Sequence, residues 1–269
     1  MSRTTTSYDS AVDVHDTAIV DRGAELGSGV RVGPFAIIGP GVRIGANSQV
    51  GPRVLIEKDT TVGAGCRIAN GAVLGTDPQD LKYEGEKTFL EIGDRTVIRE
   101  FATLNRGTAA GGVTLVGSDC LLMAYCHIAH DCEIGNHVII SNATNMAGHV
   151  AIEDWAIVSG LVAIHQFVRI GAHAFVGGGS RINRDVPPFC KATGNPSPKL
   201  YGLNAIGLDR RGFSPDVRRC LKKTYRILFQ SEWNLSQALR KVGEDPELTC
   251  PEVRYFLDFI RTSQRGIIF

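Results

Sequence analysis

Val, Ile, Leu or Met occupies every sixth position over most of this chain of 269 residues. The repeat runs unbroken from Val14 to Leu74, returns from Ile92 to Leu104, and resumes from Val116 to Ile182. A period of six matches neither the period of a helix nor the alternation of a strand. It predicts a strand that turns a corner every six residues, so that three hexads close one triangular coil and the aliphatic side chains point inward.

The hexad pattern therefore predicts a mainly β fold, a parallel β-helix solenoid of hexapeptide repeats. Prisms of this kind are known as left-handed, an exception to the right-handed crossover rule. Four positions after the aliphatic residue the side chain is usually small, and Cys66, Cys120, Cys126 and Cys132 occupy this position. Cysteines six residues apart would lie on successive faces, so we expect structural thiols and no metal site. The odd cysteine count without a Cys-x-x-Cys pair favours a reducing, cytoplasmic location.

Composition argues against several classes of protein. A formal net charge of +1 does not indicate that the chain as a whole binds nucleic acid or membranes. No run of about 18 apolar residues is present, so we expect no transmembrane segment. Residues 1–10 are polar and lack an apolar core, so we expect no secretory signal.

Two interruptions break the repeat before it ends near Pro187. The first, 76–89, contains turn signals, and the second, around 110–114, contains the pair Gly111 and Gly112. Loops that project from a solenoid are the usual place for a functional site, because the coils themselves are repetitive.

The hydrophobic period becomes helical after the solenoid. We expect amphipathic helices over 214–229, 234–242 and 251–261, the first with Ser214 as its N-cap. This divides the chain into a β-helix domain, 1–190, and a small C-terminal α-helical domain, 191–269. An open solenoid with flat faces commonly assembles by symmetry, so we expect an oligomer.

A polar block around His130 and Asp131 is the strongest candidate for chemistry. Because one coil takes 18 residues, Gly148 should lie beside His130, and His149 beside Asp131. A neutral imidazole with a carboxylate partner suits general-base catalysis, and a glycine N–H can hold an oxyanion. Without a Ser or Cys nucleophile, this patch suggests that an activated hydroxyl attacks an acyl donor directly. One coil further, His165-Gln166 can supply hydrogen bonds to a polar ligand.

Positive charge is concentrated between Arg181 and Arg226. Eleven Lys or Arg residues there face three acidic residues, in a chain that is nearly neutral as a whole. Such a run is either a solvated face or a binding surface for an acidic or phosphorylated partner.

Several segments that do not belong to the repeat resemble one family. The matching segments are 79–83, 85–86, 91–95, 98–100, 106–108, 116–119, 121–123, 127–132, 147–150, 165–167, 185–188 and 210–213. In these segments the chain closely resembles the UDP-N-acetylglucosamine O-acyltransferases, acyl carrier protein-dependent enzymes that begin lipid A synthesis. The resemblance implies a homotrimer of left-handed β-helices, with the active site between neighbouring subunits and no metal or diffusible cofactor.

The resemblance also implies roles for individual residues. His130 would take the proton from the glucosamine 3-hydroxyl as it attacks the thioester of a (R)-3-hydroxyacyl carrier protein, Asp131 would orient His130, and the Gly148 N–H would hold the oxyanion. The positions that match the UDP-sugar site are Asp80, His149, His165, Gln166, Asn204, Arg210 and Arg211. The positions that match the acyl-donor side are Gln79, Lys82 and His127, with Gly178 at a position tied to acyl length.

Two residues depart from the family pattern. Asn105 stands where a histidine is expected, and Ile206 where a glutamate is expected near the nucleotide. These departures leave a 3-amino variant of UDP-N-acetylglucosamine open as the acceptor. The fold and the histidines are also compatible with a hexapeptide transferase that uses acetyl-CoA, with a zinc enzyme of the γ-carbonic anhydrase type, and with a purely structural solenoid.

Overall fold

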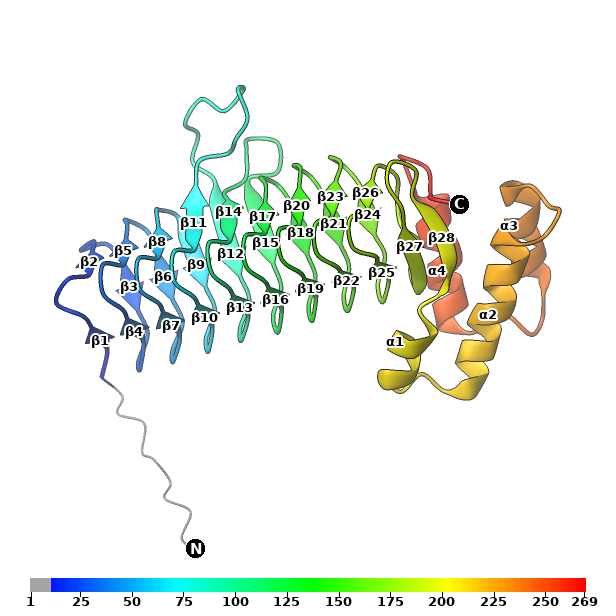
Figure 1. The fold of residues 1–269 in the computed structure, drawn as a ribbon, viewed down its shortest axis with the longest axis horizontal. Coiled ribbons are helices and arrows are strands. Elements are labelled where there is room, and N and C mark those ends of the chain that lie inside the picture. Colours follow the sequence, from blue (N-terminus) through cyan, green and yellow to red (C-terminus); the bar gives the residue numbers. More distant parts are fainter. Residues whose placement is uncertain (1–10) are drawn as a thin grey trace, which may run out of the picture.

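The computed structural model describes residues 11–269 and shows a three-sided β-prism with a helical part at its C-terminal end (Figure 1). Consecutive strands lie on successive faces, so each sheet takes every third strand. From β1 to β26 the partner strands are parallel, and partners such as Asp13 and Arg31, or His127 and Asn145, are 18 residues apart. The predicted left-handed β-helix of triangular coils is confirmed. The expectation for residues 1–10 lies outside the described residues.

Three sheets form the faces of the prism. The first contains β1 (Asp13–Val14), β4 (Arg31–Val32), β7 (Gln49–Val50), β10 (Arg67–Ile68), β13 (Val97–Ile98), β16 (Leu121–Leu122), β19 (Ile139–Ile140), β22 (Ile157–Val158), β25 (Phe175–Val176), β27 (Cys190–Thr193) and β28 (Lys199–Leu203). The second contains β2 (Ile19–Val20), β5 (Ile37–Ile38), β8 (Leu55–Ile56), β11 (Val73–Thr76), β14 (Thr103–Asn105), β17 (His127–Ile128), β20 (Asn145–Met146), β23 (Ala163–Ile164) and β26 (Arg181–Ile182). The third contains β3 (Glu25–Leu26), β6 (Arg43–Ile44), β9 (Thr60–Val62), β12 (Phe89–Ile92), β15 (Val113–Val116), β18 (Glu133–Ile134), β21 (Ala151–Ile152) and β24 (Arg169–Ile170).

Aliphatic hexad residues fill the interior of the prism. Ile56 and Ile128 are fully buried, and each such side chain contributes about 1.5–3 kcal/mol relative to an exposed one. Val14 is 38% exposed because it lies in the terminal coil, which has a neighbour on one side only. The cysteines of the hexads lie inside as expected, and burial raises the pKa of the Cys132 thiol to about 12.

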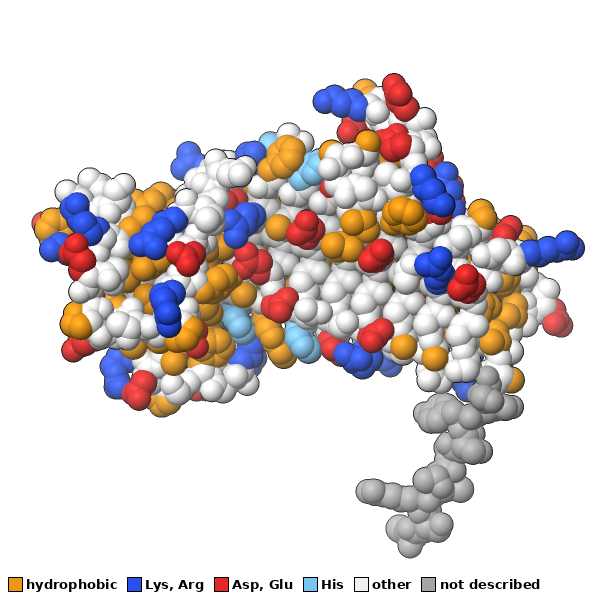
Figure 2. Space-filling view, turned by 180° about the vertical axis from the view of Figure 1, so that it is seen from behind, with side chains coloured by type: hydrophobic (Ala, Val, Ile, Leu, Met, Phe, Trp, Pro, Cys, Tyr) orange, Lys and Arg blue, Asp and Glu red, His pale blue; other side chains and the backbone are white. Residues whose placement is uncertain are grey.

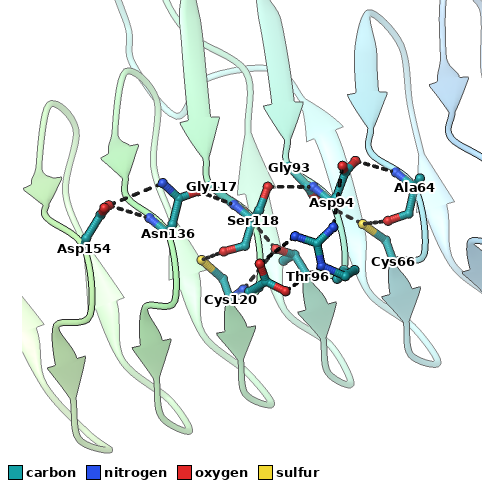
Figure 3. A network of polar contacts seen from close by, with 12 residues as sticks. Ala64, Cys66, Gly93, Asp94, Thr96, Gly117, Ser118, Cys120, Asn136 and Asp154 are labelled. Carbon is teal, nitrogen blue, oxygen red and sulfur yellow. Dashed lines mark hydrogen bonds and ion pairs between the residues drawn. The ribbon is translucent and has the colours of Figure 1, made fainter. Parts of the chain in front are cut away.

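A ladder of polar side chains joins successive coils at the corner between the third and first sheets (Figure 3). Asp94 Oδ1 accepts from the Ala64 N–H at 2.8 Å, and Ser118 Oγ accepts from the Asp94 N–H at 3.0 Å. Asn136 and Asp154 repeat the contact on the next two coils, at 2.9 and 2.8 Å. Each side chain thus satisfies a turn N–H of the coil before it, which a strand ladder cannot reach.

Two loops project from the prism between its second and third sheets (Figure 1). The first, residues 77–88, separates β11 from β12 and confirms the first interruption. The second occupies residues 106–112 rather than 110–114, because β15 already begins at Val113 and pairs there with β12. The two loops are tied together, since the Ala109 N–H donates to Glu86 Oε1 at 3.1 Å.

The helical part contains the three expected helices and two features that the pattern did not predict. The helices are α1 (Ala205–Arg210), α2 (Pro215–Phe229), α3 (Leu235–Glu244) and α4 (Pro251–Arg261). Ser214 caps α2 as predicted, with its side chain accepting from the Val217 N–H. The two unpredicted features are the short helix α1 and the antiparallel pair β27–β28. Within residues 11–269, no helix is long and apolar enough to span a bilayer.

Candidate active site

His130 and Asp131 lie in the turn between β17 and β18, where the chain passes from the second sheet to the third. His130 Nδ1 is 2.8 Å from Asp131 Oδ2, and the Asp131 side chain is only 2% exposed. Because Nδ1 faces the carboxylate, the ring donates its Nδ1 proton and leaves Nε2 as the basic nitrogen. The pair therefore has the geometry of an oriented general base.

Gly148 and His149 occupy the equivalent turn one coil further, as the 18-residue spacing predicted. The His149 N–H donates to the His130 carbonyl at 3.1 Å, and a Cβ on Gly148 would lie 2.7 Å from His130 Nε2. His149 Nε2 is 3.5 Å from the same Asp131 oxygen, and its ring stacks on Phe167 at 4.6 Å. We call these two turns, residues 129–132 and 147–150, the histidine corner.

Thr108 holds the Asp131 carboxylate and was not predicted as a site residue. Its N–H donates to Asp131 Oδ1 at 2.9 Å, and its hydroxyl donates to Oδ2 at 2.7 Å. Burial alone would raise the pKa of Asp131, but the hydrogen bonds from Thr108 and His130 outweigh it and lower the pKa. Asp131 is therefore a carboxylate at neutral pH. Thr108 precedes it by 23 residues, a separation that the coil repeat cannot predict.

A cleft of about 680 Å³ opens at the histidine corner. Predicted residues that line it are Gln79, Asp80, Lys82, His127, His130, Gly148, His149 and Gln166. Gln79, Asp80 and Lys82 come from the loop 77–88, which projects over this corner. His127 lies on β17 with its Nδ1 2.8 Å from the Thr103 hydroxyl. Burial, and then the nearby His130, lower the pKa of His127, so its ring is neutral at pH 7.

The remaining predicted residues lie outside this cleft. His165 lines a neighbouring pocket that shares Ala163 and Ile164 with it. Gly178 lies in a turn between the first and second sheets, where an added Cβ would approach the Gly160 carbonyl to 3.3 Å.

Asn204 and Arg211, the caps of α1, contact a different corner of the prism, between the third and first sheets, and Arg210 is the last residue of that helix. His137, Trp155, His173 and Phe189 stack on one another along it, and we call these four residues the tryptophan corner. Asn204 donates to the His173 carbonyl at 3.0 Å, and the Arg211 guanidinium lies 5.1 Å from the Trp155 ring centre. Figure 2 shows histidine side chains at two separate edges of the molecule.

The two departures from the family pattern have different surroundings. Asn105 is 2% exposed, and its amide donates to Thr76 Oγ1 and to the Asp77 carbonyl at 2.8 and 2.9 Å. It therefore anchors the loop 77–88 and does not line the cleft. Ile206 is 68% exposed on α1. Neither position favours the 3-amino acceptor over UDP-N-acetylglucosamine.

His130, Asp131 and His149 also offer ligand atoms within 4.8 Å of one another. Two imidazoles and a carboxylate are ligands that Zn²⁺ accepts. The site is therefore compatible by distance with a metal as well as with a general base, and metal content is a direct test between the two.

Comparisons with known proteins agree with the geometry. A model of bacterial transferase hexapeptide repeats matches residues 23–58, 41–76 and 114–148, and a model described as UDP-N-acetylglucosamine O-acyltransferase, domain 2, matches residues 185–268. An acyl-[acyl-carrier-protein]–UDP-N-acetylglucosamine O-acyltransferase of Paracidovorax citrulli is 58% identical over 94% of this chain and 98% of its own length. The protein of the same name from Paraburkholderia phymatum is 50% identical, over 95% and 98%. A UDP-N-acetylglucosamine acyltransferase structure from Bacteroides fragilis superposes with a TM-score of 0.91 at 43% identity, covering 95% of this chain and 99% of that one.

The prism and the matched repeats place this chain among the bacterial hexapeptide-repeat transferases. Within that class, the chain belongs to the UDP-N-acetylglucosamine O-acyltransferase family.

Proposed function

We propose that this chain transfers a (R)-3-hydroxyacyl group from acyl carrier protein to the glucosamine 3-hydroxyl of UDP-N-acetylglucosamine, with His130 as the general base. Nε2 of His130 takes the hydroxyl proton as the sugar oxygen attacks the thioester carbonyl. A C–O bond forms, the C–S bond breaks, and the proton passes to the leaving thiol, so the imidazole ends neutral. The observation that carries this proposal is the 2.8 Å contact between His130 and Asp131 at the Gly148 turn.

Asp131 and Gly148 have complementary roles in this proposal. Asp131 fixes the ring tautomer and stabilises the imidazolium that forms during attack, an arrangement worth about 10²- to 10⁴-fold in rate. Among the described residues, the Gly148 N–H donates no backbone hydrogen bond. We assign it to the oxyanion of the tetrahedral intermediate, because a preorganised N–H stabilises developing negative charge.

The binding roles follow the resemblance to the family, residue by residue. We assign Asp80, His149, His165 and Gln166 to the UDP-sugar, and Gln79, Lys82 and His127 to the acyl-donor side. Gly178 would leave room for the acyl chain. Asn204, Arg210 and Arg211 complete the UDP-sugar site only if a second copy of the chain supplies them, since in one chain they lie at the tryptophan corner.

This division of the site supports a homotrimer in which the tryptophan corner of one copy faces the histidine corner of the next. Co-expression of His130→Ala chains with Arg211→Ala chains tests it. Each variant alone should be inactive, but randomly mixed trimers should regain about one quarter of wild-type activity, because one site in four has both intact residues. Absence of recovery in verified mixed trimers would contradict the shared site.

We propose that acyl carrier protein, an acidic protein, docks on the basic side of α2. A groove of about 670 Å³ between β28 and α2 is lined by Arg218, Arg219, Lys222 and Arg226. Lys222→Glu should raise the KM for the acyl carrier protein thioester about 10-fold and leave the KM for the sugar nucleotide unchanged. Lys241→Glu on α3 is the control. Equal effects of the two variants would contradict this docking site.

A transfer assay tests the function as a whole. Purified protein is incubated with UDP-N-acetylglucosamine or its 3-amino analogue and a panel of 3-hydroxyacyl carrier protein thioesters. We expect the O-acylated product with one preferred chain length, and no dependence on added metal. Failure with every thioester, together with stoichiometric bound zinc, would contradict the proposal and favour a γ-carbonic anhydrase-like activity. We further propose a cytoplasmic location, and we keep the division into domains 1–190 and 191–269.

A further inference from the structure

The loop 106–112, named here the Thr108 loop, covers the Asp131 carboxylate from the outside. It leaves the prism beside the loop 77–88 (Figure 1) and returns to it at β15. Thr108 itself is 8% exposed and does not line the cleft. The loop is therefore placed to act on Asp131 without touching either substrate.

Two contacts bind this loop to Asp131. Thr108 donates to both carboxylate oxygens, from its N–H at 2.9 Å and from its hydroxyl at 2.7 Å. A Cβ on Gly111 would lie 3.0 Å from Asp131 Cγ, so the loop backbone packs directly on the carboxylate. The Asp131 N–H is held separately by Thr114 Oγ1 at 2.9 Å. The side chain of Asp131 is thus held by the Thr108 loop, and its backbone N–H by β15, the strand that follows this loop.

These contacts determine which Asp131 oxygen accepts the hydrogen bond from His130. Oδ1 faces the Thr108 N–H, while Oδ2 accepts from both the Thr108 hydroxyl and His130 Nδ1, the latter at 2.8 Å. Because Oδ2 is shared, rotation of the carboxylate would break both hydrogen bonds to Thr108 together with the contact to His130. We propose that Thr108 is a positioning residue for acyl transfer, which holds Asp131 in the one orientation that aligns His130. This inference rests on the proposed function of His130 as the base.

The chain offers a closely matched control. Thr96 is fully buried, its hydroxyl donates to the Gly117 carbonyl at 2.8 Å and accepts from the Cys120 N–H at 3.2 Å. The Thr108 hydroxyl likewise donates once, to Asp131, and accepts from the Ala110 N–H at 3.3 Å. Thr96 lies at a different corner from the cleft, between the third and first sheets (Figure 3), so Thr96→Val removes an equivalent hydroxyl without touching Asp131.

The test compares Thr108→Val, Thr108→Ser and Thr96→Val in the transfer assay and by thermal unfolding. Thr108→Val should lower kcat on the order of 10- to 100-fold, the range found when a residue that orients a functional group is removed. Its KM for UDP-N-acetylglucosamine should stay within about 2-fold, because Thr108 does not line the cleft. Thr108→Ser keeps the hydroxyl and should restore kcat to within about 3-fold, while Thr96→Val should keep wild-type kcat.

A second readout separates this inference from the proposed function. NMR of protein labelled with ¹⁵N-histidine reports the His130 ring, assigned by its loss in His130→Ala. Thr108→Val should shift the His130 Nδ1–H resonance and Thr108→Ser should not. If His130→Ala is inactive but Thr108→Val has normal kcat and an unchanged resonance, the inference is wrong and the function stands. If the wild type transfers no acyl group, the function is wrong, and the resonance alone decides whether Thr108 positions the ring.

Discussion

Gly148→Ala is the sharpest perturbation that the geometry offers. Gly148 does not have a positive φ, so its backbone conformation accepts an alanine. The added Cβ, however, would lie 2.7 Å from Nε2 and 2.9 Å from Nδ1 of His130, with the Cε1 edge nearer still. The three atoms nearest the added Cβ all belong to the His130 ring, so the substitution acts first on that ring.

The size of the effect follows from the displacement. Ordinary van der Waals contact to a Cβ begins near 3.4 Å, so Nε2 must retreat by about 0.7 Å and the Cε1 edge by about 1 Å. A displacement of about 1 Å at a reacting group costs about 100-fold in rate, which is about 2.7 kcal/mol of barrier. We expect kcat to fall by this factor while the melting temperature changes little.

Initial rates of acyl transfer measure this loss. Gly160→Ala is the control, because a Cβ there meets no atom closer than the Asn142 carbonyl oxygen, at 3.1 Å. It should retain normal kcat. A Gly148→Ala enzyme with kcat within about 3-fold of wild type would refute the argument that His130 must occupy its observed position.

Two further predictions concern regions beside the site. Burial, and to a smaller extent the Arg211 charge, lower the pKa of His173 to about 4. Between pH 6.5 and 4, His173 therefore binds a proton in the unfolded chain but not in the folded chain. The unfolding free energy should therefore fall by about 2 kcal/mol as the pH drops across that window, less than the about 3.4 kcal/mol of a fully buried ring because His173 is partly exposed. His173→Gln should remove this part of the fall in urea denaturation series. Buried Arg106 ties the loop 77–88 to the prism through Asp77, the Gly75 carbonyl and the Tyr83 hydroxyl. Arg106→Met should raise the KM for the sugar nucleotide about 10-fold in steady-state kinetics, and an unchanged KM would show that the loop holds its position without this anchor.

The regular part of the molecule could be predicted from the sequence because one spacing governs it. The 18-residue coil alone predicts that Gly148 lies beside His130 and His149 beside Asp131, and the structure confirms both contacts. The hexad positions also predicted the core, and Ser214 predicted the start of α2.

The irregular part could not be predicted by the same spacing. Thr108 reaches Asp131 through a loop, so its 23-residue separation carries no periodic signal. The helix α1 has six residues and is too short for a clear amphipathic period. Asn204 and Arg211 meet the tryptophan corner through contacts between the helical part and the prism, and no sequence spacing reveals that they lie away from His130.

The most direct test of the account is the rate of acyl transfer by His130→Ala at pH 7. With His130 as the general base, the variant should keep the oligomeric state and the melting temperature of the wild type, and its kcat should fall by about 10²- to 10⁴-fold. A folded His130→Ala enzyme with the wild-type oligomeric state and near-normal kcat would contradict the account, because a group other than His130 would then be taking the hydroxyl proton.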